Sequence, residues 1–160
     1  MALYKALSEE FLSVPRTEKE WKKIANDFYV NWQFPNCIGS LDGKHVKILP
    51  PPESGSDYRN YKGYFSEVLM ALVDANYEFI YVDMGTNGRV SDGGVWGKCD
   101  LKSAIENGHL GIPHSTALPG SNTTAPHVIV ADEAFGLKTY LMRPYPSKSL
   151  GPEERIYNYR

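Results

Sequence analysis

The sequence predicts an α/β domain in which a mixed sheet is covered by helices. Apolar runs of strand length alternate with segments that have helical periodicity. One run, residues 68–73, is apolar almost without interruption, as expected of a strand that is covered on both faces. The chain has 160 residues, of which 42% are hydrophobic and 22% charged, and this suits one domain with its own core.

Composition narrows the classes of function. The formal net charge is −2, whereas an independent DNA-binding module is usually basic, so tight DNA binding by the chain alone is disfavoured. Cys37 and Cys99 lack a close spacing and are interpreted as buried thiols of an intracellular protein. No apolar run has the length of a membrane helix and no apolar signal core is visible, so we expect no membrane partner and no secretion.

The first elements should be helical. Residues 1–13 are predicted to be the end of a helix that Pro15 breaks. Thr17 and Glu20 fit a capping box at the start of the next helix. Apolar side chains then recur at helical spacing: Trp21, Ile24, Ala25 and Phe28. We expect residues 1–35 to form a helical arm and residues 36–160 to form the main domain.

Three strands should follow the arm. Residues 37–49 predict a strand that is interrupted near Gly43, and residues 50–64 predict a loop. Two apolar runs, residues 65–73 and 78–84, are joined by the turn residues 74–77. Their spacing predicts an antiparallel hairpin.

The second half of the chain should complete the sheet. A flexible loop, residues 85–94, leads to a covering helix at 95–107, and a long connection follows at 109–126. Residues 127–131 predict a fourth strand that ends at Asp132. The last elements should be a short strand and the beginning of a helix: residues 137–142 and 153–159.

Two aspartates mark strands from distant parts of the sequence. Asp42 lies in the first predicted strand and Asp132 closes the fourth. Carboxylates in such positions can hold the divalent ions that activate water and stabilise the leaving oxygen in phosphodiester cleavage. Two structural alternatives remain open: Asp42 as a turn residue before Gly43, and Asp132 as a helix N-cap.

Six blocks of sequence, in order, resemble the nucleases derived from PIF/Harbinger DDE transposases, and the similarity covers most of residues 20–160. The blocks are NCIGSLDGKHV (36–46), YKGYFS (61–66), VDA (73–75), GRVSDGGVW (88–96), VIVADEAF (128–135) and RIYNYR (155–160). The resemblance implies a ribonuclease H-like fold, in which the first and fourth strands are neighbours. It also implies DNA as substrate and a nuclear location.

The same resemblance implies a metal site of two Asp and one Glu that binds Mg²⁺ or Mn²⁺. Asp42 matches the first acid and Asp132 the second, as catalytic residues and as metal ligands. The family's Glu lies on a final helix beyond the RIYNYR block, which this chain does not reach. The family's helical DNA-binding region lies upstream, and residues 1–35 match only a remnant of it. We therefore expect weak DNA binding by the chain alone, and a separate DNA-binding partner protein.

Two residues are candidates for supporting the acid pair. Asp92 would orient water or metal, or it would cap the helix that follows, and we favour the cap. His45 would contact phosphate or metal-bound water, and we favour a structural role. The four histidines show no zinc-site spacing: His45, His109, His114 and His127.

Cations and tyrosines alternate around the first acid. Lys44, Arg59 and Lys62 are candidates for contacts with DNA phosphates, and the interleaved tyrosines could stack on bases. The equal alternative is a solvated hairpin face whose tyrosines belong to the core.

Three functional hypotheses follow. The first is a metal-dependent endonuclease domain that is weak or inactive as this chain alone. The second is a domesticated, non-catalytic module that binds DNA or protein. The third is a transposon remnant without a function, whose sheet would expose an apolar patch.

Overall fold

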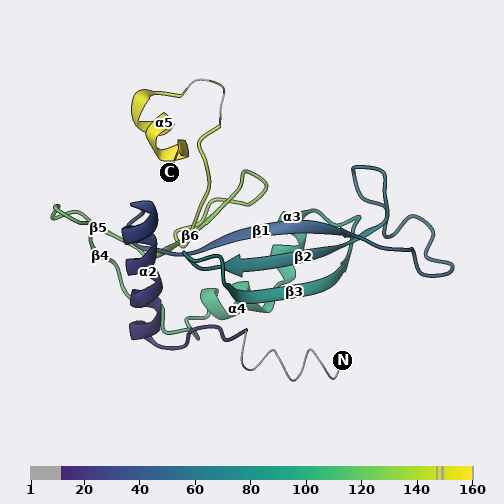
Figure 1. Ribbon diagram of the computed structural model, residues 1–160, viewed down its shortest axis with the longest axis horizontal. Coiled ribbons are helices and arrows are strands. Elements are labelled where there is room, and N and C mark those ends of the chain that lie inside the picture. The colour runs from purple at the N-terminus through teal and green to yellow at the C-terminus, as the bar shows by residue number, and fades with distance from the viewer. Residues whose placement is uncertain (1–11, 147, 149, 160) are drawn as a thin grey trace.

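A mixed five-stranded sheet forms the centre of the computed structural model, which describes residues 12–146, 148 and 150–159. The strand order is β3-β2-β1-β6-β7 (Figure 1). The first three strands are antiparallel neighbours, whereas β6 runs parallel to β1 and β7 runs parallel to β6. This order confirms the predicted α/β fold and is ribonuclease H-like. The strands are β1 (Cys37–Lys47), β2 (Ser66–Val73), β3 (Phe79–Asn87), β6 (Val128–Ala131) and β7 (Leu141–Met142).

Helix α2 (Glu18–Trp32) packs against β1 and reaches into the core. The predicted capping box is confirmed, because the Thr17 side chain accepts the Glu20 N–H and the Glu20 carboxylate accepts the Thr17 N–H. Trp21 is fully buried, and its indole Nε1 donates to the carbonyl of Leu110 at 2.8 Å. The helix ends at Gln33, whose φ of 50° is left-handed. The predicted helix at residues 1–13 lies almost wholly outside the described residues.

The predicted hairpin is confirmed as β2 and β3, and its turn depends on Asp74. One carboxylate oxygen of Asp74 accepts the N–H groups of Asn76 and Glu78, at 2.8 and 2.9 Å. Strand β1, by contrast, runs without the interruption predicted near Gly43. The local turn signal there is overridden because Gly43 pairs with Met70 in a continuous ladder.

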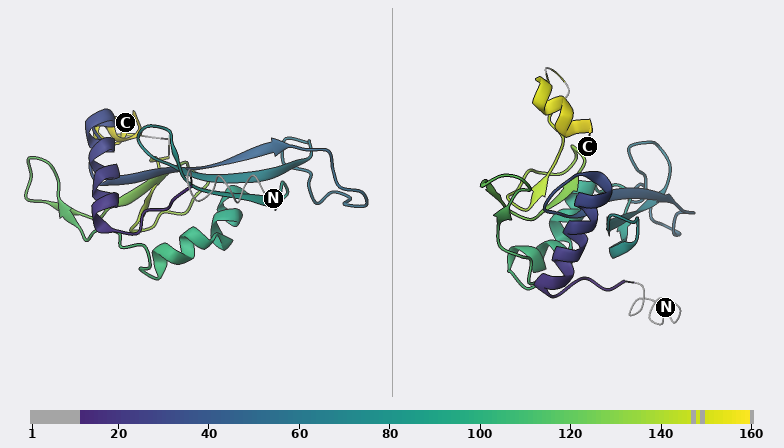
Figure 2. Two further views of the ribbon diagram at one scale, coloured as in Figure 1. Left: turned by 60° about the horizontal axis from the view of Figure 1, so that its bottom comes forward. Right: turned by 60° about the vertical axis from the view of Figure 1, so that its left-hand side comes forward.

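One face of β2 is buried and the other is only half-buried. The buried face carries Val68, Met70 and Leu72, which pack beneath helices α3 (Asp92–Lys98) and α4 (Asp100–Glu106). Figure 2 (left) shows α4 on this side of the sheet and α5 (Pro152–Tyr159) on the other. The expectation of cover on both faces is therefore correct for one face only.

The covering helix predicted at residues 95–107 is two helices. Cys99 separates α3 from α4 with an extended backbone, at φ −70° and ψ 135°. The break lets Cys99 and Leu101 both enter the core, which a single straight helix would not allow. None of the helices among the described residues has the length and apolar character that crossing a membrane requires.

The rest of the second half follows the prediction in outline. The long connection contains a small hairpin, β4 (Thr116–Ala117) with β5 (Thr124–Ala125). The fourth predicted strand is confirmed as β6, and the terminal helix is confirmed as α5. Strand β7 is shorter than expected. Helix α5 is held through Tyr157, whose ring contacts those of Phe34 and Tyr145.

Candidate active site

The parallel pairing of β1 with β6 brings Asp42 next to Asp132. Leu41 of β1 pairs with Ala131 of β6, and the residue that follows each of them in sequence is one of the two aspartates. Both aspartates are exposed. The strand order anticipated from the sequence therefore makes these carboxylates neighbours, although their chemical role stays a prediction.

Local hydrogen bonds orient each carboxylate. One oxygen of Asp42 accepts the Gly43 N–H at 2.8 Å, and one oxygen of Asp132 accepts the Ala134 N–H at 2.9 Å. Both structural alternatives from the sequence are wrong. Asp42 lies inside a strand rather than in a turn, and Asp132 begins a turn that no helix follows.

Asp92 is the third acid of this region and is the first residue of α3. The cap favoured from the sequence is wrong, because Ser91 is the N-cap and its hydroxyl accepts the Gly94 N–H. The Asp92 side chain is half-buried, and its buried Oδ1 has no hydrogen-bond partner in the described structure. Burial raises the pKa of Asp92, His45 opposes that rise, and the charges of Asp132 and Asp42 add to it. Asp92 therefore lies within electrostatic reach of the acid pair.

Asp92 approaches β1 from the helix-covered face of the sheet. A β-carbon built on Gly43 would lie 2.5 Å from the Asp92 carboxyl carbon, so the carboxylate rests directly on the Gly43 backbone. Side chains alternate along a strand, and Gly43 shares its face with the buried Leu41, whereas Asp42 points to the opposite face. Asp92 is thus behind the acid pair rather than beside it.

A buried polar network lies next to these acids. His45 Nδ1 and Ser66 Oγ are 2.9 Å apart, and the Asn60 side-chain amide also donates to Ser66 Oγ at 2.9 Å. Ser66 and Asn60 are buried. The contacts agree with the structural role favoured for His45. Sequence reasoning missed Ser66 and Asn60, since only the folded chain brings them to His45.

The predicted phosphate-binding cations occupy different positions. Lys44 is exposed and, by strand alternation, shares the face of Asp42. Lys62 is exposed, with its Nζ 5.4 Å from the centre of the Tyr61 ring, and its charge acts on Asp92. Arg59 is exposed and forms an isolated β-bridge with Phe65 just before β2. The structure thus links Lys44 to the face of Asp42 and Lys62 to Asp92.

The donor set of this site is small but of a kind that suits a divalent cation. Asp42 and Asp132 offer carboxylate oxygens, which are the ligands that Mg²⁺ and Mn²⁺ prefer. Within the part of the chain that the structure describes, no group of three or more Asp, Glu, His or Cys is arranged to hold a metal ion. The two aspartates therefore fit a cation that keeps much of its water, as Mg²⁺ does.

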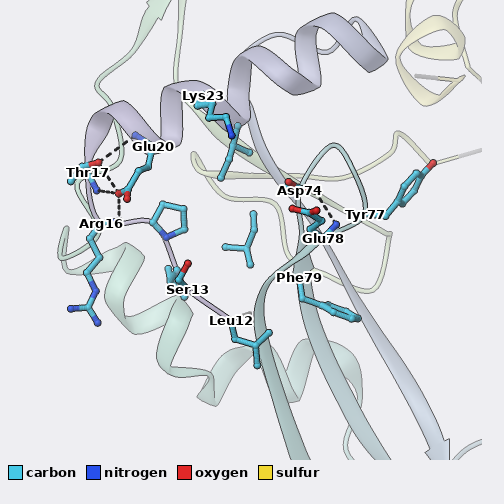
Figure 3. Close-up of a pocket in the computed structure, with 14 residues that line it drawn as sticks. Leu12, Ser13, Arg16, Thr17, Glu20, Lys23, Asp74, Tyr77, Glu78 and Phe79 are labelled. Atoms are coloured by element: carbon cyan, nitrogen blue, oxygen red, sulfur yellow. Dashed lines mark hydrogen bonds between the residues drawn. The ribbon is translucent and has the colours of Figure 1, made fainter. Parts of the chain in front are cut away.

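A large cavity lies away from these acids. It has a volume of about 1170 Å³ and lies between the chain before α2, helix α2 and the β2–β3 turn (Figure 3). Three acids line it: Glu20 and Asp74 are both engaged in backbone hydrogen bonds, and Glu78 follows the β2–β3 turn. None of the three site aspartates lines it, so this cavity is separate from the candidate site.

Comparison with known proteins gives one match. A family model described as DDE superfamily endonuclease matches residues 41–160, from the middle of β1 to the end of the chain. This range contains the two strand aspartates, Asp92 and the Asn60–Ser66 network. No curated protein and no solved structure matches the chain.

Proposed function

The chain belongs to the DDE superfamily of endonucleases, and from that premise we propose that it is a metal-dependent, DNA-cleaving domain of the Harbinger type. Asp42 and Asp132 are the proposed catalytic aspartates and metal ligands. The pairing of Leu41 with Ala131, which makes the two aspartates neighbours, is the observation that supports this proposal most strongly. The nucleus is the proposed location, since DNA is the proposed substrate.

Each residue has a distinct proposed task. A bound Mg²⁺ or Mn²⁺ would supply Lewis-acid stabilisation of phosphate oxygens and a more acidic water. Asp42 and Asp132 would hold that cation from adjacent strands. Lys44 and Lys62 would neutralise phosphates on either side of the cleaved bond, because exposed cations fix the register of DNA without reading its sequence.

We propose that the chain alone binds metal and DNA weakly. Two carboxylates provide only two negative charges, and the affinity for a hard cation rises with the number of charged ligands. The net charge of −2 also disfavours tight binding of a polyanion. A separate DNA-binding partner protein would supply the missing affinity.

Manganese binding tests the proposed site directly. Mn²⁺ would be titrated into the purified chain, and the free ion would be measured by electron paramagnetic resonance. Asp42→Asn and Asp132→Asn should each weaken Mn²⁺ binding about tenfold or more, because each removes one charged ligand. Asp100→Asn is the matched control, since Asp100 is exposed in the first turn of α4. Equal Mn²⁺ affinity in all four proteins would contradict the proposed ligands.

Cleavage of supercoiled plasmid DNA tests the activity. The chain should nick the plasmid slowly or not at all with Mn²⁺, and any nicking should disappear in Asp42→Asn. Rapid nicking that depends on Asp42 would contradict the proposed weakness but support the site. If Mn²⁺ does not bind and DNA binding survives both aspartate substitutions, the non-catalytic binding module becomes the better account.

A further inference from the structure

We propose that Tyr61 is a stacking platform for an unpaired base of the DNA substrate. The inference rests on the proposed function and adds a subsite to it. Tyr61 belongs to the loop between β1 and β2, which projects from one end of the sheet (Figure 1). Its side chain is 81% exposed, so most of the ring is open to a ligand.

The Tyr61 ring is held in place despite its exposure. Its edge-to-face contact with His45 has a centroid distance of 5.6 Å, and Lys62 Nζ lies 5.4 Å from the ring centre. His45 is itself fixed by its hydrogen bond to the buried Ser66. A ring that is ordered before binding loses little side-chain entropy when a base stacks on it.

The backbone around Tyr61 is also fixed. The Asn60 side-chain oxygen accepts the N–H groups of Lys62 and Tyr64, at 3.0 and 3.3 Å. The Gly63 N–H donates to the Asn60 carbonyl at 3.0 Å, and Gly63 has a φ of +86° that favours glycine. Asn60 thereby ties a tight turn to β2 and presents Tyr61 at its tip.

The charge near Tyr61 suits a polyanion, and a second tyrosine shows the contrast. Tyr77, in the β2–β3 turn, is 73% exposed and also makes an edge-to-face contact, with Trp32. Tyr77 lies between Asp74 and Glu78, however, whereas Tyr61 has Lys62 beside it. Two similarly exposed aromatic rings therefore differ mainly in the charge that surrounds them.

Tyr61 is also connected to Asp92. His45, which touches its ring, is on the same strand as Asp42 but, by strand alternation, on the face of Gly43 and Asp92. The charges of His45 and Lys62 both act on Asp92, so a base on Tyr61 would lie on the Asp92 side of β1. The base must be unpaired, because a base inside a duplex does not expose its face.

Fluorescence of 2-aminopurine in a single-stranded oligodeoxynucleotide tests this subsite. The titrations contain EDTA, so that the result does not depend on metal binding or cleavage. Tyr61→Ala should weaken binding about tenfold and remove the quenching that stacking causes. Tyr61→Phe should retain both, because it keeps the ring. Tyr77→Ala should bind and quench as the original chain does.

Two results would overturn the proposal. One is unchanged binding and quenching in Tyr61→Ala, and the other is an equal loss in Tyr77→Ala. The thermal unfolding of each variant is measured in parallel, to show that each is folded. Tyr61→Phe shows whether the hydroxyl group, rather than the ring, is needed for binding. Because the titrations contain EDTA, failure of the metal site is seen only in Mn²⁺ binding and failure of the stacking subsite only in 2-aminopurine fluorescence.

Discussion

Adding one methyl group at Gly43 should destabilise the domain through Asp92. The new β-carbon would lie 2.5 Å from Cγ and 3.1 Å from Cβ of Asp92, whereas carbon atoms prefer a separation of about 3.5–4.0 Å. The Asp92 side chain must therefore move by about 1 Å, and overpacking of this kind costs about 1–3 kcal/mol. Alanine in a strand recovers roughly 0.5–1 kcal/mol relative to glycine. We expect Gly43→Ala to lower the free energy of unfolding by about 1–2 kcal/mol.

A double-mutant cycle shows whether Asp92 is the cause. In an Asp92→Ala background the clash with Cγ is absent and only Cβ remains, at 3.1 Å, so Gly43→Ala should be neutral or stabilise the domain by up to about 1 kcal/mol. Urea denaturation of the four proteins, followed by circular dichroism, gives the coupling energy, which should be about 1–3 kcal/mol.

The control glycine is Gly97, in helix α3. A β-carbon there meets no atom within 4 Å, so Gly97→Ala should stabilise the domain by roughly 0.5–1 kcal/mol. If Gly43→Ala has the same cost with and without the Asp92 carboxylate, the placement of that carboxylate on β1 is wrong.

Three further predictions concern buried groups. Trp21→Phe removes the indole hydrogen bond to the Leu110 carbonyl and should lower the free energy of unfolding, measured by urea denaturation, by about 2–3 kcal/mol. Trp32→Phe should cost less, because the Trp32 indole is only partly buried, and equal costs would contradict this. Burial lowers the pKa of His127 below its usual value of 6.5, so the folded state favours neutral His127. Its contribution to stability should be present above pH 6.5 and lost as the pH falls through the lower folded pKa, and His127→Gln should flatten the unfolding free energy measured between pH 7.5 and 5. Burial raises the pKa of Cys37 to about 12. Iodoacetamide at about pH 8 should therefore label Cys37 only after urea unfolds the chain, and rapid labelling of the folded protein would contradict this.

Local signals in the sequence predicted the elements that local interactions stabilise. The capping box of Thr17 and Glu20 gave the start of α2, and the turn at Asp74 gave the hairpin, because each depends on hydrogen bonds within a few residues. The adjacency of Asp42 and Asp132 was also anticipated, from the order of strands and from family resemblance.

Contacts between distant residues account for what the sequence did not predict. The Asp42-Gly43 pair is a local turn signal, but pairing of both residues with β2 keeps β1 extended. Gly97 is only a weak local signal for the break at Cys99, which places the Cys99 side chain in the core. The contact of Asp92 with Gly43 joins a helix to a strand, and no local pattern reports such a pair.

The position of β6 beside β1, the central strand of the sheet, has a consequence for the order of folding. Strands β1, β2 and β3 pair with neighbours in sequence, whereas β6 docks on β1 only after α3, α4 and the long connection have been bridged. Loop-closure entropy makes such non-local pairing slow, so we expect the antiparallel strands to form first. An early intermediate would then present Asp42 without Asp132. Pulsed hydrogen exchange that protects β6 before β2 would refute this order. If the order holds, the capacity to hold a cation is acquired at the last folding step, and a partly folded chain is kept from metal and phosphate chemistry.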